Sequence, residues 1–333
     1  MMRLYSNAGG KLAPLPAGSD PAGAAWIDVA DPDDTDAAAL DRLGISMPSF
    51  ADMREIEVSS RLFRLDETDY MTVVLTGQVT GQEKGQVTGP GDGTAQGRTA
   101  RALPVSFILS PTRLITVRHH APRPFDTYPD HAATSAAGCA SPHHIALGLL
   151  DEIIGRQADL IEGIGDALDH LLADALDKDA SREPDRLRTL LQSLGQQGEL
   201  LGRVRLALLS IERALSFHRQ THGPAEARIV DIIDGIQHDI RALMEHSASV
   251  SERIGFATDL TLGLISVDQN TTMRIFSIVA TFFLPPTLIA SIYGMNFARM
   301  PELNSPWGYP IALAVMAGSA VLAYAIFKWR RWL

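Results

Sequence analysis

Two apolar stretches decide the fold of this chain: IFSIVATFFLPPTLIASIYG, from Ile275 to Gly294, and IALAVMAGSAVLAYAIF, from Ile311 to Phe327. No Asp, Glu, Lys or Arg occurs between residues 275 and 298, or between residues 303 and 327. A helix of about 20 apolar residues is long enough to cross the hydrocarbon core of a bilayer. Because helices in soluble cores rarely lack charge on every face, the sequence predicts two membrane spans rather than a buried helical hairpin.

The charged residues that flank these stretches predict their orientation. Arg274 precedes the first stretch, and Lys328, Arg330 and Arg331 follow the second, so both cationic ends lie on one side. The positive-inside rule places that side in the cytoplasm. We therefore expect a multi-pass protein of the inner (plasma) membrane with cytoplasmic termini, in contact with lipid, and with the link from Asn296 to Tyr309 outside.

Composition excludes several classes of protein. The chain has 333 residues, with 39 Asp and Glu against 29 Lys and Arg, and a formal charge of -10. Such an acidic chain lacks the basic patch that binding to nucleic acid requires. Its one cysteine, Cys139, excludes an internal disulfide and a cysteine-based zinc cluster. The sequence contains no P-loop, GxSxG or HExxH motif, so we expect neither an enzyme nor a bound cofactor.

Residues 1–145 predict a cytoplasmic domain of mixed α/β structure. Four short runs are typical of strands: Trp26–Val29, Tyr70–Thr76, Val105–Leu109 and Leu114–Val117. The segment DDTDAAALDRLGI, at residues 33–45, predicts a helix between the first two. Residues 77–97 are rich in glycine and contain GQVTG twice, which predicts a mobile hairpin tip or loop insertion to which we assign no function.

From Pro142 onward the pattern becomes helical. Residues 146–222 predict an acidic helical hairpin, broken at Glu183-Pro184, whose charge suits either an ordinary solvated face or an electrostatic sink for cations. Residues 223–272 predict a long stalk helix that continues into the first span, because no proline intervenes before Pro285. A helix of that length needs partners, so we expect it to pack against copies of itself. The fold class is therefore an α+β cytoplasmic domain, a stalk helix and a transmembrane hairpin at residues 273–333.

A polar stripe follows the first span. At 100° per residue, the polar residues fall within an arc of roughly 120°, which also contains Met273 and Leu284. These polar residues are Asn270, Ser277, Thr281, Thr287 and Ser291. Such a stripe suits either interhelical packing or the lining of a water-filled path, and the residues alone leave both open. Because two spans per chain cannot enclose a pore, a conduction path requires several copies around an axis.

The residues after the first span resemble a known family. The chain reads YGMNF at residues 293–297 and MPEL at residues 300–303, and it ends in a basic KWRRWL. This combination resembles the CorA family of magnesium and cobalt channels. The resemblance covers the whole architecture in outline, and individual residues match convincingly from about Asp259 onward.

The resemblance implies a funnel-shaped homopentamer with the first spans around a central pore and Mg²⁺ as its transported ion. It assigns Gly294, Met295 and Asn296 to the selective outer mouth, where neutral carbonyl oxygens accept hydrogen bonds from a hydrated ion. It implies that further side chains line the pore below, with Met273 and Leu284 as an apolar gate. The expected pore-lining residues are Asn270, Met273, Ser277, Leu284, Thr287 and Ser291. Ser291 departs from the family's usual glycine, which leaves selectivity among Mg²⁺, Co²⁺ and Ni²⁺ open.

The resemblance also implies regulation by Mg²⁺ bound between cytoplasmic domains, which closes the channel. Asp259 matches the stalk carboxylate of such a regulatory metal site. Its partner on a neighbouring subunit is not assigned, and Glu83 and Asp92 are candidates.

Two other functions remain as alternatives. One is a Zn²⁺ transporter of the same fold, as in ZntB-type proteins, for which the zinc-like groupings are His119-His120 and Cys139 with His143-His144. The spacing of these residues does not match a zinc-binding motif, and neither grouping falls in the predicted pore. The other alternative is a membrane-anchored scaffold or sensor that conducts no ions.

Overall fold

The computed structural model describes residues 1–55, 57–78, 100–177, 184–222, 227–295 and 306–330. The predicted residues Glu83, Asp92 and Asn296, and most of the glycine-rich segment, therefore lie outside the described residues. The chain divides into two units. The first comprises Met1–Asp174 and Leu191–Thr258, and the second comprises Ala175–Leu190 and Asp259–Leu333.

The first unit is built on a sheet that has seven strands within the described residues, in the order β2-β1-β3-β7-β6-β5-β4. The β3–β7 pair is parallel, with Trp26 opposite Leu114, and the other pairs are antiparallel. The strands are β1 (Met2–Ala8), β2 (Lys11–Pro14), β3 (Trp26–Ala30), β4 (Leu62–Leu65), β5 (Thr68–Gln78), β6 (Ala100–Leu109) and β7 (Leu114–Arg118). The glycine-rich segment thus connects two directly paired strands, β5 and β6.

Side chains of successive residues point to opposite faces of this sheet, and both faces are buried. On β6, Phe107 belongs to the core shared with the long helices, whereas Ile108 belongs to the core under the short helices. Leu114 and Ile115 of β7 alternate in the same way. This explains why these strands read as continuous apolar runs in the sequence.

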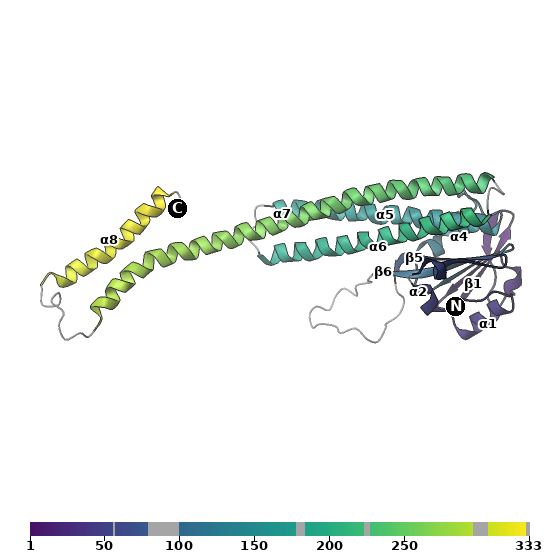
Figure 1. Ribbon diagram of the computed structural model, residues 1–333, viewed down its shortest axis with the longest axis horizontal. Helices are drawn as coiled ribbons and strands as arrows, with labels where there is room; N and C mark the ends of the chain where they lie inside the picture. The colour runs from purple at the N-terminus through teal and green to yellow at the C-terminus, as the bar shows by residue number, and fades with distance from the viewer. Residues whose placement is uncertain (56, 79–99, 178–183, 223–226, 296–305, 331–333) are drawn as a thin grey trace. The chain divides into compact units, whose positions relative to one another are not determined.

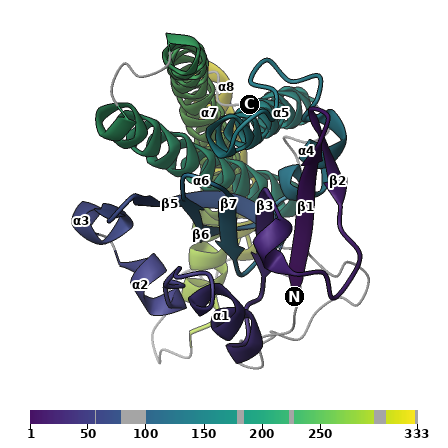
Figure 2. The ribbon, with the colours of Figure 1, turned by 90° about the vertical axis from the view of Figure 1, so that its right-hand side faces the viewer.

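Helices cover both faces of the sheet. Short helices lie on one face and the long helices on the other, with α6 directly over the sheet (Figure 2). The short helices are α1 (Asp34–Asp41), α2 (Phe50–Arg54) and α3 (Val58–Arg61). The helices beyond β7 are α4 (Pro124–His131), α5 (Pro142–Leu176), α6 (Pro184–His222) and α7 (Ala227–Tyr293). Within the first unit, α5, α6 and the N-terminal part of α7 run side by side (Figure 1).

A buried ion pair network joins three strands of the sheet. Asp28 on β3 accepts hydrogen bonds from Nε and Nη2 of Arg118 on β7, both at 3.0 Å, and from Nη2 of Arg3 on β1 at 2.7 Å. Nε of Arg3, at 3.0 Å, and the Thr116 hydroxyl, at 2.9 Å, donate to the same carboxylate. The Asp28 carboxylate is fully buried, so its negative charge depends on Arg3 and Arg118 rather than on water for stabilisation.

The second unit contains the two apolar helices. It comprises the C-terminal part of α7, from Asp259 to Tyr293, and α8 (Gly308–Trp329), together with residues 175–190. Both α7 and α8 are long and apolar enough to cross a membrane. Figure 1 shows α8 folding back alongside the end of α7.

Candidate pore helix

One side of the α7 span packs against α8. The half-buried residues of the span lie on this side, and Phe282 faces Phe327 of α8 with ring centroids 6.0 Å apart. These half-buried residues are Ile278, Phe282, Pro285, Pro286, Ile289 and Tyr293. On α8 the buried positions include Gly308, Ala312 and Ala323, small residues that allow two helices to approach closely.

The predicted pore-lining residues lie on the other side of α7. All six are exposed in the single chain: Asn270, Met273, Ser277, Leu284, Thr287 and Ser291. At 100° per residue, the centre of this stripe is about 150° around the helix from the side that packs against α8. The structure therefore brings these residues onto one surface that the chain's own second span does not cover.

Three hydroxyl groups of the stripe share one orientation. Ser277 donates to the Met273 carbonyl at 2.9 Å, Thr281 to Ser277 at 2.8 Å and Thr287 to Phe283 at 2.7 Å. Each hydroxyl proton is thus used within the helix, and the outward side of each oxygen retains only acceptor lone pairs. The water ligands of a hydrated cation are hydrogen-bond donors, so this surface is complementary to such an ion.

Large apolar side chains, among them Met273 and Leu284, interrupt the polar stripe. Met273 is 68% exposed and Leu284 is 67% exposed in the single chain. Pro285 and Pro286, beside Leu284, lie inside α7 and provide no N–H for the carbonyls one turn earlier.

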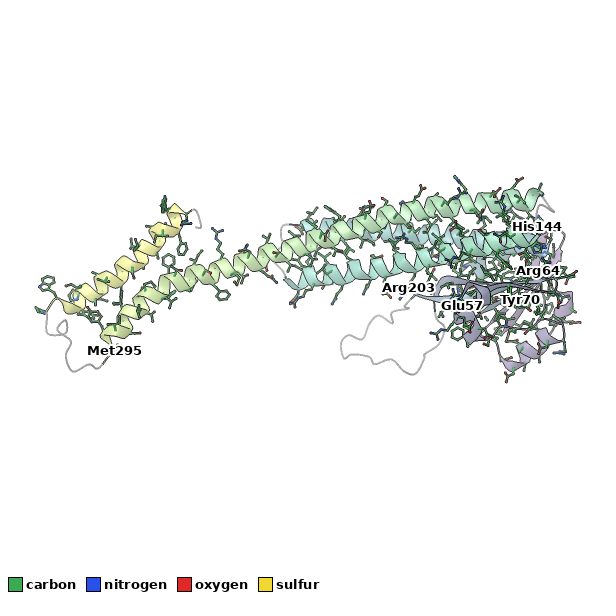
Figure 3. The ribbon with its side chains drawn as sticks, viewed as in Figure 1. Glu57, Arg64, Tyr70, His144, Arg203 and Met295 are labelled. Atoms are coloured by element: carbon green, nitrogen blue, oxygen red, sulfur yellow. The ribbon has the colours of Figure 1, made fainter. Side chains whose placement is uncertain are left out.

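The end of α7 is formed by Gly294. Its N–H donates to the Ala290 carbonyl at 2.9 Å, and the Met295 N–H donates to Ile292 at 3.2 Å. A Cβ at Gly294 would lie 3.3 Å from the Ala290 carbonyl oxygen, a close approach that favours glycine. Met295 is exposed just beyond the helix end (Figure 3), and Asn296 follows outside the described residues.

Asp259 lies on α7 near the start of its second-unit part, far in sequence from the predicted mouth. Its side chain is exposed, and no hydrogen bond or ion pair joins its carboxylate to another described residue. The single chain thus leaves it available to a ligand or to a neighbouring copy.

The zinc-like groupings seen in the sequence do not form sites among the described residues. Cys139 donates its S–H to the Gly10 carbonyl at 3.0 Å, and Nδ1 of His144 lies 2.7 Å from the Ser141 hydroxyl. His120 is bound to the Leu75 carbonyl at 3.0 Å. His143 instead meets His218 and His222, a cluster that the sequence analysis missed.

A folded α+β unit, one helix shared by both units and a C-terminal pair of apolar helices define a membrane protein with two C-terminal spans. The family model for "CorA-like Mg2+ transporter protein" matches residues 21–329, so the chain belongs to this family. The expected fold class and family are thereby confirmed.

Individual relatives agree with this assignment. The chain is 32% identical to the magnesium transport protein CorA of Pasteurella multocida, over 93% of this chain and 92% of the relative. It is 30% identical to the CorA protein of Escherichia coli K12 over the same shares. The CorA magnesium transporter structure from Methanocaldococcus jannaschii superposes with a TM-score of 0.73 at 18% identity, covering 100% of this chain and 99% of that one, and so has the same fold.

Proposed function

We propose that this chain is a passive channel that takes up Mg²⁺ across the inner (plasma) membrane, with Co²⁺ as a second ion and Ni²⁺ as a further candidate. One observation carries the proposal: the polar stripe of α7 lies on the side that α8 leaves uncovered, in a chain of the CorA-like family. The relatives' names, magnesium transport protein, support Mg²⁺ as the principal ion.

The channel is a homopentamer in this proposal. An exposed stripe of amide and hydroxyl oxygens is unfavourable against lipid, because hydrocarbon offers no donors to their acceptor lone pairs. When several copies turn this side of α7 toward a common axis, the stripe lines a water-filled pore on that axis. The second span, α8, then faces lipid with its apolar surface.

Ion selection occurs at the outer mouth in this proposal. Mg²⁺ holds its water ligands tightly, so a mouth that accepts hydrogen bonds from the hydrated ion avoids the cost of stripping them. Gly294 ends the helix, Met295 follows it, and Asn296 supplies a neutral side-chain carbonyl to the ring. The acceptor-only hydroxyl surfaces of Ser277 and Thr287 continue the same chemistry inward.

Transport requires no chemical energy in this proposal. The membrane potential contributes about 4.6 kcal/mol per 100 mV for a divalent ion moving inward. Flow stops when Met273 and Leu284 close the apolar constriction. Cytoplasmic Mg²⁺, bound between subunits with Asp259 as one ligand, stabilises that closed arrangement.

The test is uptake by the purified chain in liposomes with a negative interior, comparing Mg²⁺, Co²⁺, Ni²⁺ and Zn²⁺. We expect Mg²⁺ entry in the wild type and entry at background level in Asn296→Ala, with the oligomer intact. Ser319→Ala is the matched control, because it removes a hydroxyl from α8, where Ser319 bonds to the Met316 carbonyl at 2.7 Å.

Each alternative has its own outcome in this experiment. Preferred entry of Zn²⁺ over Mg²⁺ supports the ZntB-type function, and no flux of any ion supports a scaffold or sensor. Uptake by Asn296→Ala at the wild-type rate refutes the role of the mouth amide.

A further inference from the structure

Three histidines from two helices meet in the first unit. His143 lies in the first turn of α5, and His218 and His222 lie at the end of α6. One ring nitrogen of each lies within 4.8 Å of those of the other two. His218 and His222 are four residues apart, so their side chains project from the same face of α6. Figure 3 labels His144, which follows His143 in the chain, and Arg64, whose Nε lies 3.7 Å from Oδ1 of the buried Asp69.

A buried carboxylate supports the histidines from the sheet. Asp69, at the start of β5, has no exposed side-chain surface, and its Oδ2 accepts a hydrogen bond from Nε2 of His222 at 2.6 Å. The same oxygen lies 3.7 Å from Nδ1 of His218. In metal sites, a carboxylate that binds one ring nitrogen of a histidine fixes the tautomer and leaves the other nitrogen for the ion.

Two of the nitrogens lie at a spacing that suits a metal. With protons on the nitrogens facing Asp69, lone pairs remain on Nε2 of His218 and Nδ1 of His222. Nδ1 of His143 lies 3.4 Å from Nε2 of His218. A tetrahedral ion with bonds of about 2.0–2.1 Å needs ligand atoms about 3.3 Å apart.

The cluster also leaves buried polar atoms unsatisfied. Oδ1 of Asp69 and Nδ1 of His218 have no hydrogen-bond partner among the described residues, and the His218 side chain is only 2% exposed. A metal at Nε2 of His218 would not itself bind these two atoms. A small shift of the His218 ring would bring its Nδ1 within hydrogen-bond distance of the Asp69 carboxylate, and Nε of Arg64 already lies 3.7 Å from Oδ1. Burial and the neighbouring imidazoles lower the pKa of His143 to about 4, so its ring is neutral, as a metal ligand must be, at pH 7.

We propose that His143, His218 and His222 bind one divalent transition-metal ion of the Zn²⁺, Co²⁺ and Ni²⁺ class, with Asp69 as the positioning carboxylate. Three imidazoles select these ions against Mg²⁺, which requires oxygen ligands in octahedral geometry. The fourth position is open to water, because His143 and His222 are half-buried rather than enclosed. Binding ties the start of α5, the end of α6 and the edge of β5 together, independently of any transport.

The test uses the purified full chain in detergent, stripped with EDTA, and then titrated with Zn²⁺ or Co²⁺. We expect one tightly bound ion per chain, visible d–d absorption of four-coordinate Co²⁺, and a higher thermal unfolding temperature with Zn²⁺. Millimolar Mg²⁺ should not displace the ion. His143→Gln and His222→Gln should lose this binding, and Asp69→Asn should weaken it about 10- to 100-fold.

His170→Gln is the matched control, because His170 is an exposed histidine on α5 outside the cluster, and it should bind as the wild type does. Unchanged Zn²⁺ affinity in both His143→Gln and His222→Gln overturns the proposal, since the ion is then held in the pore or on the surface. Displacement by Mg²⁺ also overturns it. If one variant fails to fold, the other variant and the Co²⁺ spectrum of the wild type decide.

Discussion

Phe282 of α7 faces Phe327 of α8 across 6.0 Å, and this contact fixes which side of the first span the second span covers. Ile289 lies on the same side as Phe282 and is half-buried, whereas Ser291, only two residues further, is exposed on the opposite side. The first span therefore has one face that packs against α8, with Ile289, and an opposite face, with Ser291, that α8 does not cover. In a membrane, only neighbouring copies or water can satisfy the polar groups of that second face.

The exposed face should react with water-soluble thiol reagents. In liposomes containing the full chain, Ser291→Cys should be labelled rapidly from outside, with loss of Mg²⁺ uptake, because it lies near the outer end of the proposed pore. Ile289→Cys is the matched control and should react much more slowly, because α8 covers it. The native Cys139 is buried and contributes little background. Equal labelling of the two variants would place both on lipid or packing surfaces and exclude the proposed pore face.

Much of this fold could be predicted because its signals are local. The absence of charge marks both spans, and Pro184 marks the start of α6 because proline suits the first turn of a helix. β6 and β7 are recognisable because strands buried on both faces are continuously apolar. The first strands, β1 and β2, were missed, because MRLYSNA and KLAP have no such run and depend on pairing with β3.

The histidine cluster could not be predicted from local signals in the sequence. His143 is 75 residues from His218, and Asp69 is 153 residues from His222, so the chain must fold before they meet. The spacing of His218 and His222 was the one local signal, since two histidines four residues apart on a helix share a face. The arrangement of α7 around an axis is equally non-local, because it depends on other copies of the chain.

Cytoplasmic Mg²⁺ should protect the assembled protein from limited proteolysis, with Asp259 as a contributor. Carboxylates that face each other between subunits repel, and a bridging Mg²⁺ favours the close-packed state. Protection should grow with the logarithm of Mg²⁺ concentration above the dissociation constant. Asp259→Ala should need more Mg²⁺ for the same protection, whereas Glu252→Ala, another exposed acid on α7, should behave as the wild type. If Mg²⁺ protects none of the three proteins, cytoplasmic sensing is wrong. Equal protection of all three keeps sensing but removes Asp259 from it.

Gly148 should be intolerant of alanine although it lies within helix α5. A Cβ there would lie 2.4 Å from the Tyr128 hydroxyl oxygen and 3.0 Å from its Cζ. Tyr128 cannot easily yield, because it is fully buried and packs edge-on against Trp26 at 6.0 Å. We expect Gly148→Ala to lower the free energy of unfolding by about 1–3 kcal/mol.

Gly155→Ala is the control for this substitution, because it lies on the same helix with nothing within 4 Å of a new Cβ. It should raise the free energy of unfolding by up to about 1 kcal/mol, since alanine is the better helix former. Thermal unfolding of the full chain, followed by circular dichroism, compares the two. A stability of Gly148→Ala equal to that of Gly155→Ala would show that the Tyr128 ring moves freely.

Stability should fall on mild acidification, in part through His120. Its Nε2 donates to the Leu75 carbonyl at 3.0 Å, and Nδ1 is buried without a hydrogen-bond partner among the described residues. Burial, aided by the nearby Arg118 charge, lowers the pKa of His120 to about 4, against 6.5 for an ordinary histidine. Between these values the unfolded chain binds a proton that the folded chain does not, so the free energy of unfolding decreases as pH falls.

The effect of His120 on the free energy of unfolding appears only below pH 6.5. As pH falls from 6.5 towards 4, this effect lowers the free energy of unfolding by at most about 3 kcal/mol. His119, His143 and His222 also have lowered pKa values, so they add to the slope in the same direction. His120→Gln keeps a donor for Leu75 but cannot take up the proton. It should therefore flatten the dependence of unfolding on pH in this window, whereas His238→Gln, at an exposed position, should not. Denaturant unfolding of the full chain at a series of pH values measures both slopes. Identical slopes for His120→Gln and the wild type would mean that the folded protein admits the proton at His120 without cost.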